Sequence, residues 1–137
     1  MKATKKLLIL ILLGILIIAL ISFKSRAEEQ QPTLVAYKAT AYCLPGTMAN
    51  GEEVRPGACA VSDRKLIGKT LIMYQRLPDG SVGEMIGIYD ICDTGCKKGV
   101  VDVWQPTYEE CQGFMNRVYE DGCKGKVFIQ ILDEVHG

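Results

Sequence analysis

The chain lacks the residue types on which several large classes of enzyme depend. Its 137 residues contain one histidine, His136, next to the last residue. A Ser-His-Asp or Cys-His arrangement needs a histidine beside its nucleophile, so we expect neither. The motifs H-E-x-x-H, G-x-x-x-x-G-K-[ST] and G-x-G-x-x-G are absent as well. We therefore expect no metal site, no cofactor and no nucleotide-binding loop.

An excess of charge of one sign is also missing, because sixteen basic residues balance sixteen acidic ones. The balance hides an asymmetry along the chain. All sixteen acids but only eleven of the bases follow residue 27, which gives this part a formal charge of 11 − 16 = −5. Such a composition predicts no basic patch for nucleic acid and no attraction to anionic lipid.

A long apolar run occurs once, close to the N-terminus. It covers residues 7–23, a run of seventeen that follows a segment with three lysines. This length is short for a membrane-spanning helix and long for the core of a signal peptide. Basic residues at 24 and 26 favour an uncleaved anchor over cleavage after Ala27. Residues 1–27 are therefore a membrane anchor or signal peptide, and the lysines predict that the rest lies outside the cytoplasm.

The remaining chain is expected to form a short polar linker, residues 28–33, and one small domain, residues 34–137. Thr107, with Glu110 three residues later, predicts the start of one late helix, and Gly122 predicts its end. Turn residues such as Pro78-Asp79-Gly80 separate short β-forming runs. This pattern is typical of a mainly β fold, a small closed barrel. We expect its strands over residues 34–42, 58–62, 70–74, 85–91, 100–103 and 127–132.

Six cysteines follow the apolar run, and their number is even: Cys43, Cys59, Cys92, Cys96, Cys111 and Cys123. In an exported domain with a limited core, this favours up to three disulfides. A zinc site is the alternative, but it needs close ligand pairs and only one such pair is present. Proximity in sequence predicts the pairs Cys43–Cys59, Cys92–Cys96 and Cys111–Cys123, one of fifteen possible connectivities.

Aspartate carboxyls are the remaining candidates for catalytic groups in this sequence. Asp63, Asp93 and Asp102 fall at predicted strand ends or in loops, where site residues are often displayed. A carboxylic acid can protonate a glycosidic oxygen when burial or a second carboxylate raises its pKa. Two glycines between Asp93 and Asp102 allow the chain to bring these carboxyls together. The alternative is that both only accept backbone hydrogen bonds in a turn.

Four short motifs, taken in order, resemble the three-aspartate (3D) domain of bacterial cell-wall proteins. They are Ala39-Thr40-Ala41-Tyr42, then Ala60-Val61-Ser62-Asp63 with Gly68-Lys69-Thr70-Leu71, then Asp93-Thr94-Gly95-Cys96-Lys97-Lys98-Gly99, and finally Val101-Asp102-Val103. The resemblance covers residues 37–132. It implies a six-stranded double-psi β-barrel, similar to membrane-bound lytic transglycosylase A, rare lipoprotein A and the expansin-like barrels.

The resemblance also implies an activity, that of a membrane-tethered peptidoglycan lytic transglycosylase. Asp102 would act as the acid/base, supported by Asp93 and Asp63, at the bond between N-acetylmuramic acid and N-acetylglucosamine. Attack by the muramoyl C6 hydroxyl would close a 1,6-anhydro ring without water. Tyr42 and Trp104 either stack on sugar rings or fill the core. The expected substrate-binding residues are Thr40, Tyr42, Thr94, Gly95 and Trp104.

Two other functions fit the same residues. A non-catalytic, expansin-like module would grip wall glycan through the same groove. An aspartic protease also carries Asp-Thr-Gly after apolar residues, but the single copy here would require a dimer. We expect a monomer whose partners are peptidoglycan glycan strands and, through the N-terminal helix, the membrane.

Overall fold

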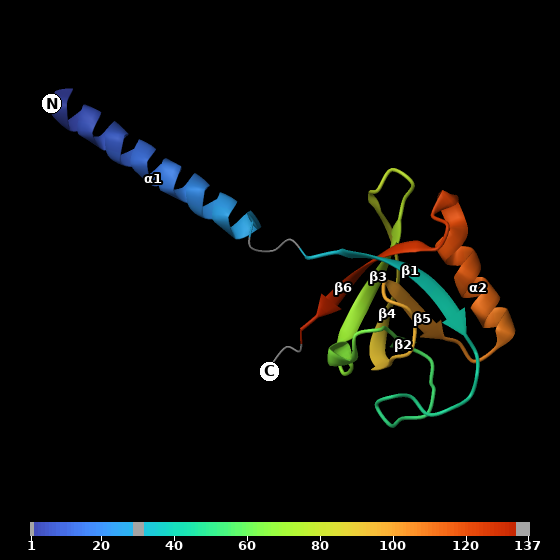
Figure 1. Ribbon diagram of the computed structural model, residues 1–137. Helices are drawn as coiled ribbons and strands as arrows, with labels where there is room; N and C mark the ends of the chain where they lie inside the picture. The colour runs from blue at the N-terminus through green and yellow to red at the C-terminus, as the bar shows by residue number, and fades with distance from the viewer. Residues whose placement is uncertain (1, 29–31, 134–137) are drawn as a thin grey trace. The chain divides into compact units, whose positions relative to one another are not determined.

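The computed structural model describes residues 2–28 and 32–133. The chain divides into two compact units, Met1–Pro32 and Thr33–Gly137. The first unit contains helix α1 (Lys2–Glu28), whose segment Lys2–Ser22 has a mean hydropathy of 2.6 (Figure 1). This helix is long and apolar enough to cross a membrane, and it fits a membrane anchor or a signal sequence equally.

The second unit is a closed β-barrel with the strand order β1-β5-β2-β4-β3-β6. The β1–β5 and β2–β4 pairs are parallel, and the other neighbours are antiparallel. This architecture confirms the predicted fold class, mainly β with six strands and one late helix. The strands are β1 (Val35–Tyr42), β2 (Ala58–Ala60), β3 (Thr70–Arg76), β4 (Val82–Asp93), β5 (Val100–Trp104) and β6 (Lys126–Leu132).

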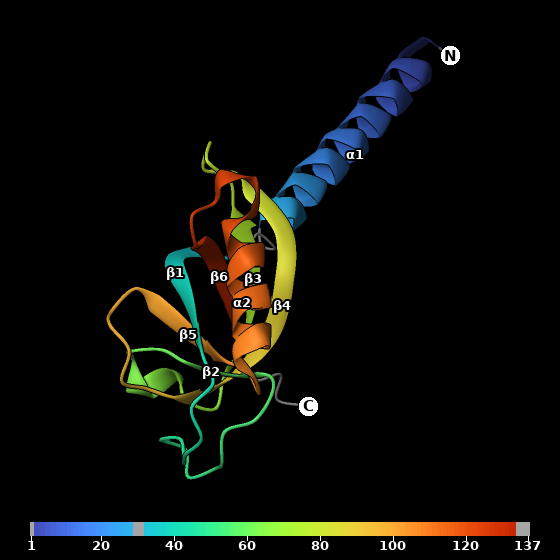
Figure 2. The same ribbon diagram turned by 90° about the vertical axis from the view of Figure 1, so that its right-hand side faces the viewer.

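Helix α2 (Tyr108–Tyr119) lies along the barrel and contacts β1 and β6 (Figure 2). Its start is the predicted one, because Thr107 Oγ1 accepts a hydrogen bond from the Glu110 amide at 3.2 Å. Phe114 and Val118 join the barrel core, and the Phe114 ring meets Tyr89 edge to face, with centroids 6.4 Å apart. A 3₁₀ turn, η2 (Glu120–Gly122), follows the helix.

The alternation of side chains along the strands separates the core from the outer face of the barrel. Val101 and Val103 of β5 are fully buried. Asp102, between them, and Trp104, after them, therefore belong to the outer face. Thr40 and Tyr42 of β1 are the ladder partners of Asp102 and Trp104 and share that face. Four of the predicted site residues thus meet on two neighbouring strands.

Seven strand boundaries differ from the prediction by one to three residues: the starts of β1, β4 and β6 and the ends of β2, β3, β4 and β5. β4 begins at residue 82 because Val82 pairs with Arg76 near the Pro78-Asp79-Gly80 hairpin, where Gly80 has φ +85°. β5 extends to Trp104 because that residue pairs with Tyr42. β2 ends at residue 60, and the chain then enters a 3₁₀ turn, η1 (Arg64–Leu66). The longer β4 places Asp93 on a strand, where ladder pairing fixes its backbone.

Candidate functional site

Asp102 lies half-buried at the point where β1 and β5 run side by side. Its ladder partner Thr40 donates a hydrogen bond from Oγ1 to Asp102 Oδ1 at 2.8 Å. Burial raises the pKa of the Asp102 carboxyl, the hydrogen bond from Thr40 opposes that rise, and the charge of Asp93 adds to it. A carboxyl whose pKa is raised by its surroundings is better suited to act as a general acid than an exposed aspartate.

Asp93 reaches the same region from the other side of β2. Ala60 is the ladder partner of Asp93 on β4 and of Asp102 on β5. Because neighbouring strands are about 4.8 Å apart, the backbones of the two aspartates lie roughly 10 Å apart. Ala60, on the strand between them, carries only a methyl group and is 4% exposed. Both Ala49 N, at 2.9 Å, and Thr94 N, at 2.8 Å, donate to Asp93 Oδ1.

Asp93 therefore does accept backbone hydrogen bonds, as the simpler interpretation of the sequence predicted. These bonds hold its carboxylate in one orientation, and its charge still acts on Asp102. The structure thus shows a structural role for Asp93, and its supporting role in catalysis stays a prediction.

Tyr42 supplies a hydroxyl rather than only a ring. Its Oη is buried, and it has no hydrogen-bond partner among the residues that the structure describes. Burial, and then the charges of Asp93 and Asp102, raise the pKa of Tyr42 to about 12. The hydroxyl is therefore neutral at ordinary pH and able to donate. Buried polar groups without a partner are rare.

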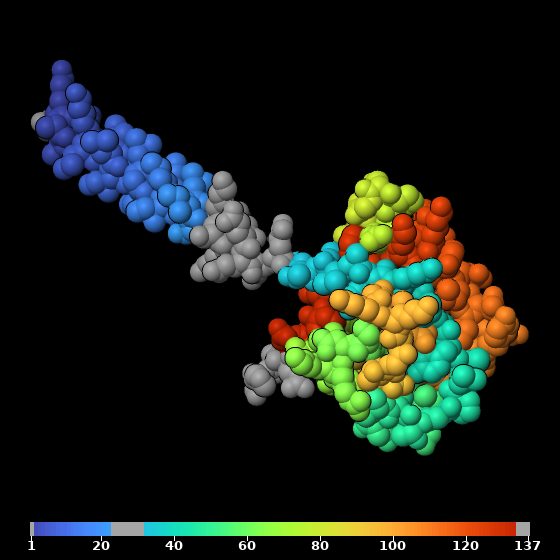
Figure 3. All heavy atoms as spheres, viewed as in Figure 1, coloured from blue at the N-terminus to red at the C-terminus, as the bar shows by residue number. Residues whose placement is uncertain are grey.

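Trp104 stands next to Tyr42, and its indole Nε1 donates to the carbonyl of Leu44 at 2.9 Å. This bond fixes the ring while leaving it partly exposed. Thr94 and Gly95 lie in the loop after β4, where Gly95 adopts φ +104°. The gold atoms of this loop lie at the surface beside the cyan atoms of β1 (Figure 3).

Asp63 is placed differently from the other two candidate acids. Its carboxylate caps η1 by accepting a hydrogen bond from the Lys65 amide at 3.0 Å. Its charge contributes to the raised pKa of Tyr37, whereas the charge that raises the pKa of Asp102 comes from Asp93. The geometry gives Asp63 the role of a helix cap.

Sequence reasoning missed Ala60 and an ion pair that holds the loop of residues 44–57. Arg55 Nη2 donates to Asp90 Oδ2 at 3.0 Å and lies 3.6 Å from Cys92 Sγ. Thr70 Oγ1 donates to the other oxygen of Asp90 at 3.2 Å. Arg55 and Asp90 are 35 residues apart, so no local pattern marks them as partners.

All six cysteines are free thiols in the structure, and none of the predicted pairs is present. Two of those pairs do not fit the fold. Helix α2 separates Cys111 from Cys123, and the helical residues after Cys111 alone span roughly 12 Å, beyond the ~7 Å that a disulfide bridges. Cys59 lies on β2, which β5 separates from the strand that leads to Cys43.

The thiol of Cys111 contacts Cys43 instead. Burial raises the pKa of Cys111, and the charge of Cys43 and a hydrogen bond with it follow as causes. The two segments meet because Gln105 N donates to Tyr42 O at 2.8 Å just before α2. We expect oxidised glutathione to form a Cys43–Cys111 disulfide first, taking up two electrons and two protons. Peptide mapping after alkylation checks this, and a Cys111–Cys123 peptide would contradict it.

Metal ligands do not gather in the described part of the chain: residues 2–28 and 32–133 hold no group of three or more His, Cys, Asp or Glu side chains arranged for a metal ion. His136 lies outside the described residues.

Comparison with known proteins gives a fold neighbour. The solved structure of Streptomyces papain inhibitor (SPI) is similar to this chain, with a TM-score of 0.49 and 12% sequence identity, over 74% of this chain and 96% of the inhibitor. A likeness at this level carries no argument about function. No family model and no curated protein sequence matches the chain. The resemblance to the three-aspartate domain stays a prediction.

Proposed function

We propose that the barrel is a peptidoglycan lytic transglycosylase in which Asp102 is the acid/base. The observation that carries the proposal is the state of this carboxyl. It is half-buried, fixed by Thr40 and close enough to Asp93 for that charge to raise its pKa further. A carboxyl in such surroundings retains its proton to a higher pH than an exposed aspartate, as a general acid requires.

The proposed reaction needs only one carboxyl, because the same group first gives a proton and then takes one back. Protonated Asp102 gives its proton to the glycosidic oxygen while the bond from that oxygen to C1 of N-acetylmuramic acid breaks. The resulting carboxylate then takes the proton of the C6 hydroxyl as O6 bonds to C1 and closes the 1,6-anhydro ring. Asp102 ends the cycle protonated, and no water is consumed. A hydrolase instead uses two carboxyls in separate roles around a water or a covalent intermediate.

The neighbouring groups have complementary parts in this proposal. The Asp93 carboxylate, held by two backbone amides, stabilises the positive charge that develops at C1. The Tyr42 hydroxyl is buried, so it would have to become exposed as the sugar binds in order to donate to it. Trp104, fixed by its bond to Leu44, offers a ring face for a sugar.

Helix α1 is assigned in the proposal as an anchor that keeps the domain outside the cytoplasm, where peptidoglycan lies. The three lysines before the apolar run support an inside N-terminus. The polar linker and the negative charge of the exported part agree with a domain that acts on wall glycan away from anionic lipid.

Digestion of purified peptidoglycan in ¹⁸O-water by the full chain in neutral detergent tests the proposal. We expect 1,6-anhydromuropeptides without ¹⁸O at the cleaved end, read by mass spectrometry. Reducing ends that carry ¹⁸O would show that water attacks the sugar. The protein would then be a hydrolase and not a transglycosylase. Retention of the protein on the wall without any cleaved product would instead support the glycan-binding module, whose groove would include the same Tyr42 and Trp104.

A further inference from the structure

The composition predicts no basic patch, but the fold gathers four of the eleven basic residues that follow residue 27. Lys38 of β1 and Lys126 of β6 are ladder partners. The next step of the β3–β6 ladder, beyond its last pair, brings Arg76 opposite Lys126. These three residues, called the cationic row below, cross three neighbouring strands on the outer face, and Lys124 lies just before β6.

No carboxylate in the described part of the chain forms an ion pair with the cationic row, although Glu120 and Asp121 lie close enough to Cys123 in the neighbouring turn for their charges to act on its thiol. In residues 2–28 and 32–133 the ion pairs are those of Arg55 and Lys69 with their carboxylates, and none involves the row. The nearby hairpin acid, Asp79, is occupied by the amide and hydroxyl of Ser81 at 2.9 and 2.6 Å. Like charges opposite one another on adjacent strands destabilise a sheet. A bound anion would remove this repulsion.

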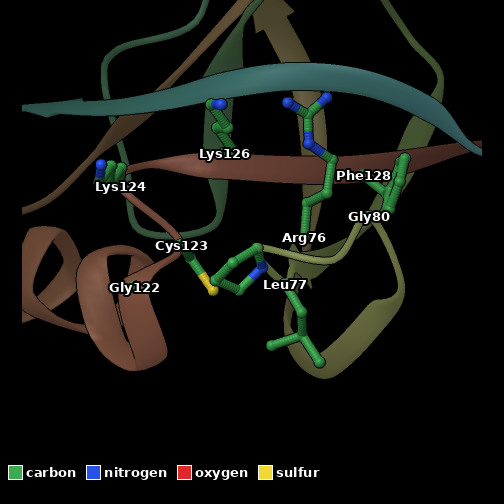
Figure 4. A pocket seen from close by; sticks show the side chains of 9 residues that line it. Arg76, Leu77, Gly80, Gly122, Cys123, Lys124, Lys126 and Phe128 are labelled. Carbon is green, nitrogen blue, oxygen red and sulfur yellow. The ribbon is translucent and has the colours of Figure 1, made fainter.

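A pocket of about 620 Å³ adjoins the row, between the β3–β4 hairpin and the turn before β6. Figure 4 shows the side chains of Arg76, Lys124 and Lys126 around it. The Arg76 guanidinium carbon lies 5.8 Å from the centroid of the Phe128 ring. This distance is within the range of a cation–π contact, which places the guanidinium beside the Phe128 ring. A guanidinium can donate to two oxygens of one ligand group.

We propose that the cationic row and this pocket bind a chain of phosphate groups. A phosphate presents several strong acceptor oxygens to a guanidinium fork and to lysines, whereas a carboxylate presents two and a single charge. Three cations in succession across the strands match several linked phosphates better than one. Lys38 precedes Thr40 by two residues on the same face, so the row begins beside the candidate site. The proposal does not depend on the transglycosylase activity.

Titration calorimetry with sodium polyphosphate tests the proposal, using the full chain in neutral detergent at several salt concentrations. The Lys126→Gln variant removes the middle cation, and we expect roughly tenfold weaker binding, the loss of one charge-assisted contact. The slope of log K against log salt is expected to fall by about one. Lys65→Gln makes the same charge change on η1 and is the matched control, with unchanged binding expected.

Several results would overturn the proposal, and each is separate from glycan cleavage. Equal weakening by Lys65→Gln would show that net charge alone governs binding. Equal affinity for polyglutamate of the same charge would remove the preference for phosphate. If inorganic phosphate bound as tightly as polyphosphate, the site would recognise one phosphate group and not a chain of them. If polyphosphate did not bind even at low salt, the cationic row would not be a phosphate site.

Discussion

Replacement of Asp102 by asparagine is expected to lower the rate of anhydromuropeptide formation by about 10²–10⁴-fold, the usual contribution of a general acid/base. Asparagine keeps the shape of the side chain and can still accept the 2.8 Å hydrogen bond from Thr40, but it has no proton to exchange. The initial rate of product formation, followed by mass spectrometry with the full chain, measures the effect. A loss of less than tenfold would rule out the proposed role of Asp102.

Asp63→Asn is the matched control for this experiment. The resemblance to the three-aspartate domain assigns Asp63 a supporting role, whereas the structure shows it capping η1. Asparagine caps a helix about as well as aspartate, so the control is expected to retain activity within a few-fold. A loss as large as that of Asp102→Asn would restore Asp63 to the catalytic group.

The thermal stability of Asp102→Asn shows whether a loss of activity comes from the missing proton or from unfolding of the protein. The pKa of Asp102 is raised in the folded state, so its ionisation removes stability as pH rises through that folded pKa. Asparagine does not ionise. We therefore expect the variant to unfold at a higher temperature than wild type near pH 8, and the difference to vanish near pH 3, below the ordinary aspartate pKa of about 3.9.

The role of Asp102 can also be tested by the pH dependence of cleavage, in variants that keep its carboxyl and change its neighbours. Asp102 must be protonated to act first as an acid, so activity falls as pH rises through its pKa. The Thr40 hydrogen bond lowers that pKa, so Thr40→Val is expected to move the falling limb to higher pH. The Asp93 charge raises the pKa, so Asp93→Asn is expected to move the limb to lower pH. Shifts in the same direction would mean that another group titrates.

Local patterns account for the parts of the fold that sequence predicts well. The cap at Thr107, the Pro78-Asp79-Gly80 turn and the β-branched runs act within a few residues, and the structure confirms each of them. The ends of β4 and β5 were missed because they are decided by partners on other strands. A strand end depends on which neighbour is present, and no local pattern contains that neighbour.

The same distinction separates the site residues. The approach of Asp93 and Asp102 was predictable because a short glycine-containing loop joins them. The roles of Ala60, Arg55 and the Tyr42 hydroxyl follow from ladder register and loop closure, which a linear pattern does not contain. The cationic row was missed for the same reason. Its members lie far apart in sequence, in the part of the chain after residue 27 where acids outnumber bases.

Replacement of Ala60 by leucine is expected to lower activity by about 10²-fold, although Ala60 has no reactive group. It is the ladder partner of both Asp93 and Asp102, and only its methyl group stands between them. A leucine would force extra volume into this closely packed position and push the reacting groups apart, and displacements of about 1 Å cost this much. The site is tightly packed, with 4% of Ala60 exposed, so a stability loss of about 1–3 kcal/mol is also expected.

Ala58→Leu distinguishes the two effects. Ala58 lies on the same strand two residues earlier, is fully buried and pairs with Asp90 rather than with the acid pair. The same increase in volume is therefore expected to cost similar stability, seen as a lower Tm, but to reduce the rate several-fold at most. If both variants lost activity in proportion to stability, Ala60 would matter only for packing and the two aspartates would not act on one substrate bond.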